Sequence, residues 1–409
     1  MRIRPLSSFA RDLGRARGGG AFDHAEREAA ARIVRAVRRD GDAAVLRIVR
    51  RFDRPRARGA DLVIDRTELR RYARSCPKPV RAALDLAYQR IYAFHLLQRP
   101  HEPRLRDQGV DIQLIHFALD RVGALVPRGV ASYPSTALMT GVPAQVAGVR
   151  ELVVASPMSA DGFLDPALAY ALTLVDAALL YRAGGAAAVA ALAYGTRLVQ
   201  RVDKIVGPGN AFAAAAKWLV SADVGIDGLQ GPSELVAIAS TGIDPRNLAL
   251  DLRAQAEHGS GAFSALIATD VDLLRAVGHG LGRESARVFG YLAPDLLAAA
   301  DAADAASPEH VLLAGRAAAA LAPRVRRAGA VFVGTRSAVA FGDYVVGTNH
   351  SLPTGGTARW SSPLRVEDCL RWTSVVQFRS PEPRLAQAGM VIAEREGMAF
   401  HAASLGARV

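Results

Sequence analysis

Short aliphatic runs, each followed by a turn and a helical segment, recur through the middle of the chain. Val122–Val126 leads into a Pro-Arg-Gly turn, and Asp203–Val206 leads into a glycine turn and a further helix. This order of strand, turn and helix is typical of a parallel sheet with crossover helices, whose chemistry is expected at the carboxyl ends of the strands. The pattern predicts further strands over 152–155, 178–181, 234–239, 264–268, 310–313 and 330–333.

The strands fall into two series, and helices flank them. This predicts an α/β fold with two Rossmann-like parallel-sheet domains of incomplete type and helical appendages at both ends. We divide the chain into an N-terminal appendage (1–22), a larger α/β domain (23–125 and 233–364), a second α/β domain (126–232) and a C-terminal helical tail (365–409). Apolar periodicity predicts helices over 25–39, 42–52, 80–97, 135–147, 272–287, 367–373 and 385–396, and one that carries Gln255 and continues through His258.

Size and composition narrow the class of protein. A chain of 409 residues is too long for one ordinary core, so two or more domains are expected. No apolar run reaches the roughly 20 residues needed to span a bilayer, and the first residues lack the apolar core of a secretion signal. Cys76 and Cys369 are the only cysteines, too few and too far apart for a disulfide framework or a thiolate zinc site. We therefore expect a cytoplasmic protein without a membrane partner.

The formal net charge of +12 invites comparison with nucleic-acid-binding proteins. The arginines, however, are scattered along helices with acidic residues between them. No basic run is combined with aromatic side chains that could stack on bases. A nucleic-acid partner is not expected.

One helix places two metal-ligand types on the same face. Gln255 and His258 are three residues apart, which sets them about 60° apart around a helix. This pair alone is more often a surface turn than a ligand pair. Three later segments favour ligands, because each sets a histidine close to a carboxylate and to glycine or proline: Ser307–His310, Gly342–His350 and Glu396–His401.

The turn Gly207-Pro-Gly209 stands at a predicted helix start. Backbone N–H groups in such a turn can cradle a phosphate, although most turns of this kind are only turns. No G-x-G-x-x-G motif stands between a strand and a helix.

With these segments in order, the chain resembles the histidinol dehydrogenase family over nearly its whole length. The resemblance rests on six motifs with matching order and spacing: Val202–Asn210, Gly231–Glu234, Gln255–His258, Pro308–His310, Gly342–Thr354, and Glu396 with His401.

The resemblance implies a role for each matching residue. Gln255, His258, Asp343 and His401 match zinc ligands, a set without thiolate that leaves coordination positions for substrate. Glu309 and His310 match the acid/base pair, and Asn210 matches a contact to NAD. The matching substrate-binding residues are Ser233, Gln255, His258, His310, Asp343, His350, Glu396 and His401.

The implied reaction is the zinc- and NAD-dependent four-electron oxidation of L-histidinol to L-histidine through the aldehyde, with two NAD consumed. His310 takes the hydroxyl proton, and Glu309 activates the water that hydrates the aldehyde. The resemblance also implies a homodimer in which the tail carrying His401 completes the site of the partner subunit.

The cofactor side departs from the family pattern. A Tyr-x-Pro-Gly-Gly turn reads Leu125-Val-Pro-Arg128-Gly129 here, and a Gly-Gly-Ala-Gln segment ends in Ala187. Of three expected NAD contacts, Asn210 alone is kept. Three alternatives follow: a histidinol dehydrogenase, favoured by Glu396 and His350; a relative that oxidises another small polar alcohol, favoured by the altered turns; and a zinc-binding protein that no longer uses NAD.

Overall fold

The computed structural model describes residues 1–18, 20–107, 109–129, 131–259, 261–283 and 288–408. The chain divides into two compact units, the first formed by Met1–Gln98 with Leu119–Cys369 and the second by Arg99–Ala118 with Leu370–Val409. Within the described ranges, no helix has the length and apolar character to cross a membrane.

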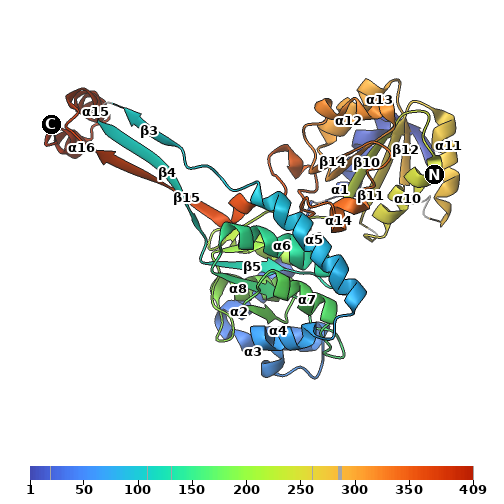
Figure 1. The fold of residues 1–409 in the computed structure, drawn as a ribbon, viewed down its shortest axis with the longest axis horizontal. Helices are drawn as coiled ribbons and strands as arrows, with labels where there is room; N and C mark the ends of the chain where they lie inside the picture. The colour runs from blue at the N-terminus through green and yellow to red at the C-terminus, as the bar shows by residue number, and fades with distance from the viewer. Residues whose placement is uncertain (19, 108, 130, 260, 284–287, 409) are drawn as a thin grey trace. The chain divides into compact units, whose positions relative to one another are not determined.

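One sheet of the first unit collects strands from the first half of the chain (Figure 1). Its order is β2-β7-β6-β5-β8-β9, and every neighbouring pair is parallel except β2 with β7. The strands are β2 (Val63–Asp65), β5 (Arg121–Leu125), β6 (Glu151–Ala155), β7 (Leu179–Tyr181), β8 (Lys204–Val206) and β9 (Gly225–Ile226).

Helices flank this first sheet, and alanine-rich sequences allow them to pack closely. Helix α8 buries every residue from Ala186 to Ala193, and α2 and α9 pack against it. A capping box between Asp23 and Glu26 starts α2 by satisfying two free N–H groups. The helices are α2 (His24–Asp40), α3 (Asp42–Phe52), α4 (Arg66–Ala73), α5 (Lys78–Leu96), α6 (Pro134–Ala147), α7 (Pro166–Leu174), α8 (Gly185–Tyr194) and α9 (Ala211–Val220).

The other sheet of the first unit is parallel throughout, in the order β1-β12-β11-β10-β13-β14. Its core is split between two faces, because successive strand residues point to opposite sides. Val236 and Ile238 pack with α1 and α12, whereas Leu235 and Ala237 pack with α10 and α11. The elements are β1 (Arg2–Pro5), α1 (Phe9–Arg17), β10 (Glu234–Ala239), α10 (Pro245–Ala256), β11 (Phe263–Ala268), α11 (Val271–Gly280), β12 (Val288–Leu292), α12 (Leu296–Ala306), β13 (His310–Ala314), α13 (Arg316–Ala319), β14 (Ala330–Val333) and α14 (Ala340–Tyr344).

The second unit is an antiparallel ribbon with two helices (Figure 1). Strand β4 pairs with β15 along nine residues, and β3 pairs with the first part of β4. Helices α15 and α16 pack together. Their bounds are β3 (Arg104–Asp107), β4 (Val110–Ala118), β15 (Leu370–Phe378), α15 (Pro383–Arg395) and α16 (Ala399–Gly406).

The α/β class with parallel sheets is confirmed, and several expected elements differ from those observed. Strands β2 and β5 lie in the sheet of 151–226, although we grouped them with 233–364. Residues 1–22 are not a helical appendage, because β1 pairs with β12 and α1 packs into the same core. The helix expected over 367–373 is wrong: a short 3₁₀ turn (Val366–Cys369) leads into β15, whose β-branched and aromatic residues suit a strand. The end of the helix expected over 272–287 lies outside the described residues.

Candidate active site

The candidate acid/base residues stand where two neighbouring strands begin. Ser233 precedes β10, Glu309 precedes β13, and the register pairs Leu235 with His310. Adjacent parallel strands start at the same edge, so these loops meet. The candidate acid/base residues of this sheet therefore lie in the segments that enter the strands, and not at the carboxyl ends where the strand pattern leads us to expect the chemistry.

A chain of hydrogen bonds links Gln255, Ser233 and Glu309. Nε2 of Gln255 donates to Oγ of Ser233 at 2.8 Å, and that hydroxyl donates to Oε2 of Glu309 at 2.5 Å. The N–H of Glu234 donates to the same carboxylate oxygen at 2.8 Å. With its nitrogen engaged, Gln255 keeps its carbonyl oxygen as the atom suited to a metal.

The surroundings of His310 settle which ring nitrogen carries hydrogen. Its Nδ1 lies 3.2 Å from the main-chain oxygen of Glu234 and 3.4 Å from Oε2 of Glu309. Both neighbours are acceptors, so Nδ1 is the protonated nitrogen of the neutral ring. Nε2 is therefore the atom that can take a proton from a substrate.

Burial and charge act in opposite directions on this pair. Burial by itself would lower the pKa of His310, but the charge and hydrogen bond of Glu309 outweigh it and raise that pKa above its ordinary value. Burial would raise the pKa of Glu309, yet the charge of His310 and hydrogen bonds from His310 and Ser233 lower it. The two groups thus favour an ion pair with the proton on imidazole.

Asp343 and His350 belong to the same neighbourhood. Nδ1 of His350 lies 3.0 Å from the main-chain oxygen of Asp343, a residue of α14. The Asp343 carboxylate also acts on His310, and it raises the pKa of both imidazoles. For His350 burial outweighs that charge, so its pKa lies below the ordinary value.

The predicted helix through His258 ends two residues earlier, at Ala256. His258 is exposed, and its Nδ1 lies 3.3 Å from the main-chain oxygen of Gln255. A metal-binding histidine commonly engages one ring nitrogen in this way and offers the other. Among the described residues, no three His, Cys, Asp or Glu side chains gather as metal ligands. The donor chemistry fits zinc, and the four-ligand set stays a prediction.

Two further predicted site residues lie in the second unit. Glu396 follows the last residue of α15, and His401 lies in α16. Both side chains are exposed. Their predicted part in substrate and zinc binding stays a prediction.

The cofactor-side positions follow the carboxyl ends of strands in the other sheet. Gly207 has φ +96°, and a Cβ there would lie 2.5 Å from the main-chain oxygen of Leu125, so the turn requires glycine. Asn210 caps α9 by accepting a hydrogen bond from the N–H of Ala213 at 3.0 Å. Leu125 and Ala187 are buried in the core, the latter only 1% exposed.

The charge of the neighbouring Arg128 acts on two carboxyl groups, those of Asp53 and Asp161. Burial raises the pKa of Asp53 to about 6, and the charge of Arg128 opposes that rise. The pKa of Asp161 is lowered, chiefly by hydrogen bonds from Ser159 and from backbone N–H groups, with a smaller contribution from Arg128.

Two ion pairs with buried carboxylates lie next to the segments that carry the candidate site residues, and the sequence did not predict them. Arg17 binds Glu234 through two hydrogen bonds. Lys217 donates to Asp227 and to Gln230, in the segment that leads to Ser233. Glu234 lies within a recognised motif, but nothing in the sequence pairs it with an arginine 217 positions away.

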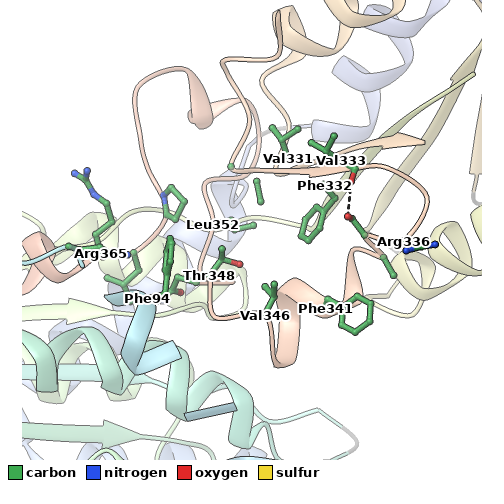
Figure 2. Close-up of a pocket in the computed structure, with 18 residues that line it drawn as sticks. Phe94, Val331, Phe332, Val333, Arg336, Phe341, Val346, Thr348, Leu352 and Arg365 are labelled. Carbon is green, nitrogen blue, oxygen red and sulfur yellow. Dashed lines mark hydrogen bonds between the residues drawn. The ribbon is translucent and has the colours of Figure 1, made fainter. Parts of the chain in front are cut away.

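A separate cavity of about 590 Å³ lies beside β14 and α14 (Figure 2). Phe94, Phe332 and Val346 line it. Thr348 and Asn349, the two residues before His350 in the sequence, line it as well. None of the candidate catalytic or metal-binding side chains lines this cavity.

Comparison with known proteins gives one consistent result. A model of the family "Histidinol dehydrogenase" matches residues 19–409. The chain is 41% identical to the histidinol dehydrogenase of Syntrophotalea carbinolica over 399 residues, which cover 93% of this chain and 92% of the relative. It is 38% identical to that of Sulfurisphaera tokodaii over 380 residues, covering 92% and 94%.

A solved structure agrees with the sequence relatives. The histidinol dehydrogenase of Elizabethkingia anophelis superimposes with a TM-score of 0.91 at 26% identity, covering 100% of this chain and 97% of that one.

Proposed function

The chain belongs to the histidinol dehydrogenase family, and from this premise we propose that it oxidises L-histidinol to L-histidine through the aldehyde, in histidine biosynthesis. The observation that carries the proposal is the buried acid/base pair, with Nε2 of His310 left to accept a proton. Free thiols at Cys76 and Cys369 and membership of a biosynthetic family support a cytoplasmic location.

The acid/base pair serves the two oxidations differently. His310 in its neutral form accepts the hydroxyl proton of the alcohol through Nε2 as hydride leaves the adjacent carbon. Glu309 then takes a proton from water that adds to the aldehyde, and the resulting hydrate loses the second hydride. Proton transfer of this kind contributes roughly 10²–10⁴-fold to a rate.

Zinc and NAD are part of the proposal. Gln255, His258, Asp343 and the partner subunit's copy of His401 would hold zinc, which supplies a positive charge that binds and orients the amino alcohol. Asn210 and the turn from Gly207 would hold NAD, which accepts the hydride of each oxidation. Ser233, His350 and Glu396 complete the substrate site.

A homodimer with shared sites accounts for the surface of the second unit. Apolar side chains there stay exposed, among them Val376, Phe378, Ile392 and Phe400, the last 90% exposed. Exposed apolar surface on this scale marks an interaction site. We propose that a second copy of the chain covers it, which brings His401 and Glu396 to the neighbouring subunit.

A second candidate function is the NAD-linked oxidation of another small polar alcohol. It is favoured by the cofactor side, where Leu125 and Ala187 are buried apolar residues and an arginine, Arg128, stands in the turn, with its charge acting on Asp53 and Asp161. The proposed acid/base chemistry is the same for either substrate.

The test is NADH formation by the purified zinc-loaded protein. With L-histidinol we expect two NADH per substrate molecule, and with other polar alcohols at least 10²-fold lower kcat/KM. A preference for another alcohol would select the second candidate, and no NADH with any alcohol would refute both.

Half-reactions test the separate roles. His310→Ala should slow the oxidation of added alcohol and of added aldehyde alike. Glu309→Gln should spare the alcohol step more than the aldehyde step, since water addition belongs to the latter. Equal losses for Glu309→Gln would contradict this division.

A further inference from the structure

Glu234 stands between the two candidate catalytic residues. Its N–H donates to Oε2 of Glu309 at 2.8 Å, and its main-chain oxygen faces Nδ1 of His310 at 3.2 Å. One peptide segment at the start of β10 therefore fixes both the carboxylate and the ring. Any displacement of this segment moves both groups.

The side chain of Glu234 is itself held by a partner from the far N-terminus of the chain. Nε and Nη2 of Arg17 donate to its two carboxylate oxygens at 2.7 and 2.9 Å. The Glu234 side chain is 3% exposed and that of Arg17 is 21% exposed. Such a two-point contact fixes orientation as well as charge.

Arg17 is held in place from both sides. It is the last residue of α1, whose Phe9 and Leu13 pack into the core beneath β10. A Cβ at Gly356 would lie 2.7 Å from Nη1 of Arg17, so the loop after Thr354 closes over the guanidinium. The arginine therefore has little freedom to leave Glu234.

We propose that Arg17 is a positioning residue for the acid/base pair, acting through Glu234. It holds the start of β10 and neutralises a buried carboxylate beside Glu309. The inference rests on the proposed function for the roles of Glu309 and His310. The family match begins at residue 19, so Arg17 lies outside the matched range.

Removing Arg17 alone should leave the Glu234 carboxylate buried without its partner. The groups that already act on His310 are Glu309 beside it, Asp343 from α14 and the neighbouring His350. An added uncompensated negative charge raises the pKa of the imidazole further. His310 then becomes a neutral base only at higher pH.

The test compares Arg17→Met, Arg17→Lys, the double variant R17M/E234Q and the control Arg15→Met. Arg15 is an exposed arginine in the last turn of the same helix, so the control removes an equal charge. Arg17→Met should lower kcat by roughly 10²-fold, with a smaller change in KM, because the pair is displaced. The acidic limb of its pH profile should move up by about one unit.

The other variants separate positioning from folding. The double variant should return the acidic limb to the wild-type pH, because the unpaired charge is gone. Arg17→Lys should give an intermediate kcat, since it keeps the charge and loses the two-point contact. If Arg17→Met does not fold, these two variants still carry the test.

A readout without substrate separates this inference from the proposed function. In NMR spectra of histidine-labelled protein, the His310 signal, assigned with His310→Gln, should titrate at higher pH in Arg17→Met and normally in Arg15→Met. Equal kcat and equal titration in Arg17→Met and Arg15→Met would overturn the role of Arg17. Arg17→Met could also lose kcat without any shift of the acidic limb of its pH profile. If the double variant then does not restore kcat, the role of Arg17 is structural only.

Discussion

Oε2 of Glu309 lies 3.4 Å from Nδ1 of His310, and both side chains are buried at the edge of the parallel sheet that contains β10 and β13. At this distance the charge of each group shifts the pKa of the other. The protonation states of the pair therefore depend on pH.

The first prediction follows from the raised pKa of His310. A base must be neutral to accept a proton, so kcat/KM should rise as pH climbs through a value above about 6.5, the ordinary histidine pKa. Glu309→Gln removes the negative charge and should move this limb to lower pH. The measurement is kcat/KM for the alcohol step across pH; an unmoved limb in Glu309→Gln would contradict the coupling.

The second prediction concerns the metal. His258→Ala should lower bound zinc well below one per chain and remove activity with it, whereas His279→Ala, at another exposed histidine, should leave both unchanged. Bound zinc is measured by elemental analysis after dialysis. Acid should release zinc from the wild-type protein, because imidazole ligands must be unprotonated to bind a metal. Stoichiometric zinc in His258→Ala would remove that residue from the ligand set.

The third prediction separates two roles of Asn210. Asn210→Ala loses the helix cap and should cost about 1 kcal/mol of stability, while Asn210→Asp keeps the cap. If the amide also contacts NAD, both variants should bind NAD more weakly and only Asn210→Ala should lower Tm. Calorimetry of NAD binding and thermal unfolding measure the two effects. Normal NAD affinity in Asn210→Asp would leave Asn210 a structural cap.

The fourth prediction tests the shared site. Asp343→Ala removes a proposed ligand that each chain contributes to its own site. His401→Ala removes a proposed ligand that the C-terminal tail contributes to the partner's site. Each homodimer should therefore be inactive. In a mixed population about half of the dimers are hybrids with one intact site of two, so roughly a quarter of wild-type activity should return. Differential tags confirm that hybrids form. An inactive mixture containing hybrids would show that each tail serves its own chain.

The sequence patterns predicted buried parallel strands such as β10 and β13, because these are short aliphatic runs between turns. They did not predict β1, β3, β4, β9, β12 or β15. The candidate acid/base residues lie at the other edge of the β10–β13 sheet from the carboxyl ends that the strand pattern indicates, in the segments that enter the strands. Strand β15 was missed because its exposed face mixes polar and apolar residues, which hides the period of two.

The contacts that fix the candidate site were the least predictable part. Glu309 and His310 were identified by a motif, whereas the tautomer of His310 depends on the main-chain oxygen of Glu234. The partner of Glu234 is Arg17, which lies in the segment that the sequence assigns to an N-terminal appendage. Long-range pairs of this kind have no signature in spacing or composition.

The candidate acid/base residues lie at the amino edge of one sheet, and the cofactor-side positions lie at the carboxyl edge of the other. This difference has an electrostatic consequence. At the amino edge of the β10–β13 sheet, α10 ends beside Gln255 and α12 ends just before Glu309, so the negative poles of two helix dipoles face this edge. At the carboxyl edge of the other sheet, α8 and α9 begin, at Gly185 and Ala211, and present positive poles. Negative poles favour a metal ion and a protonated amine, and positive poles favour the phosphates of a dinucleotide. A single chain thus offers opposite fields to the two proposed reactants, before any side chain contributes its own charge.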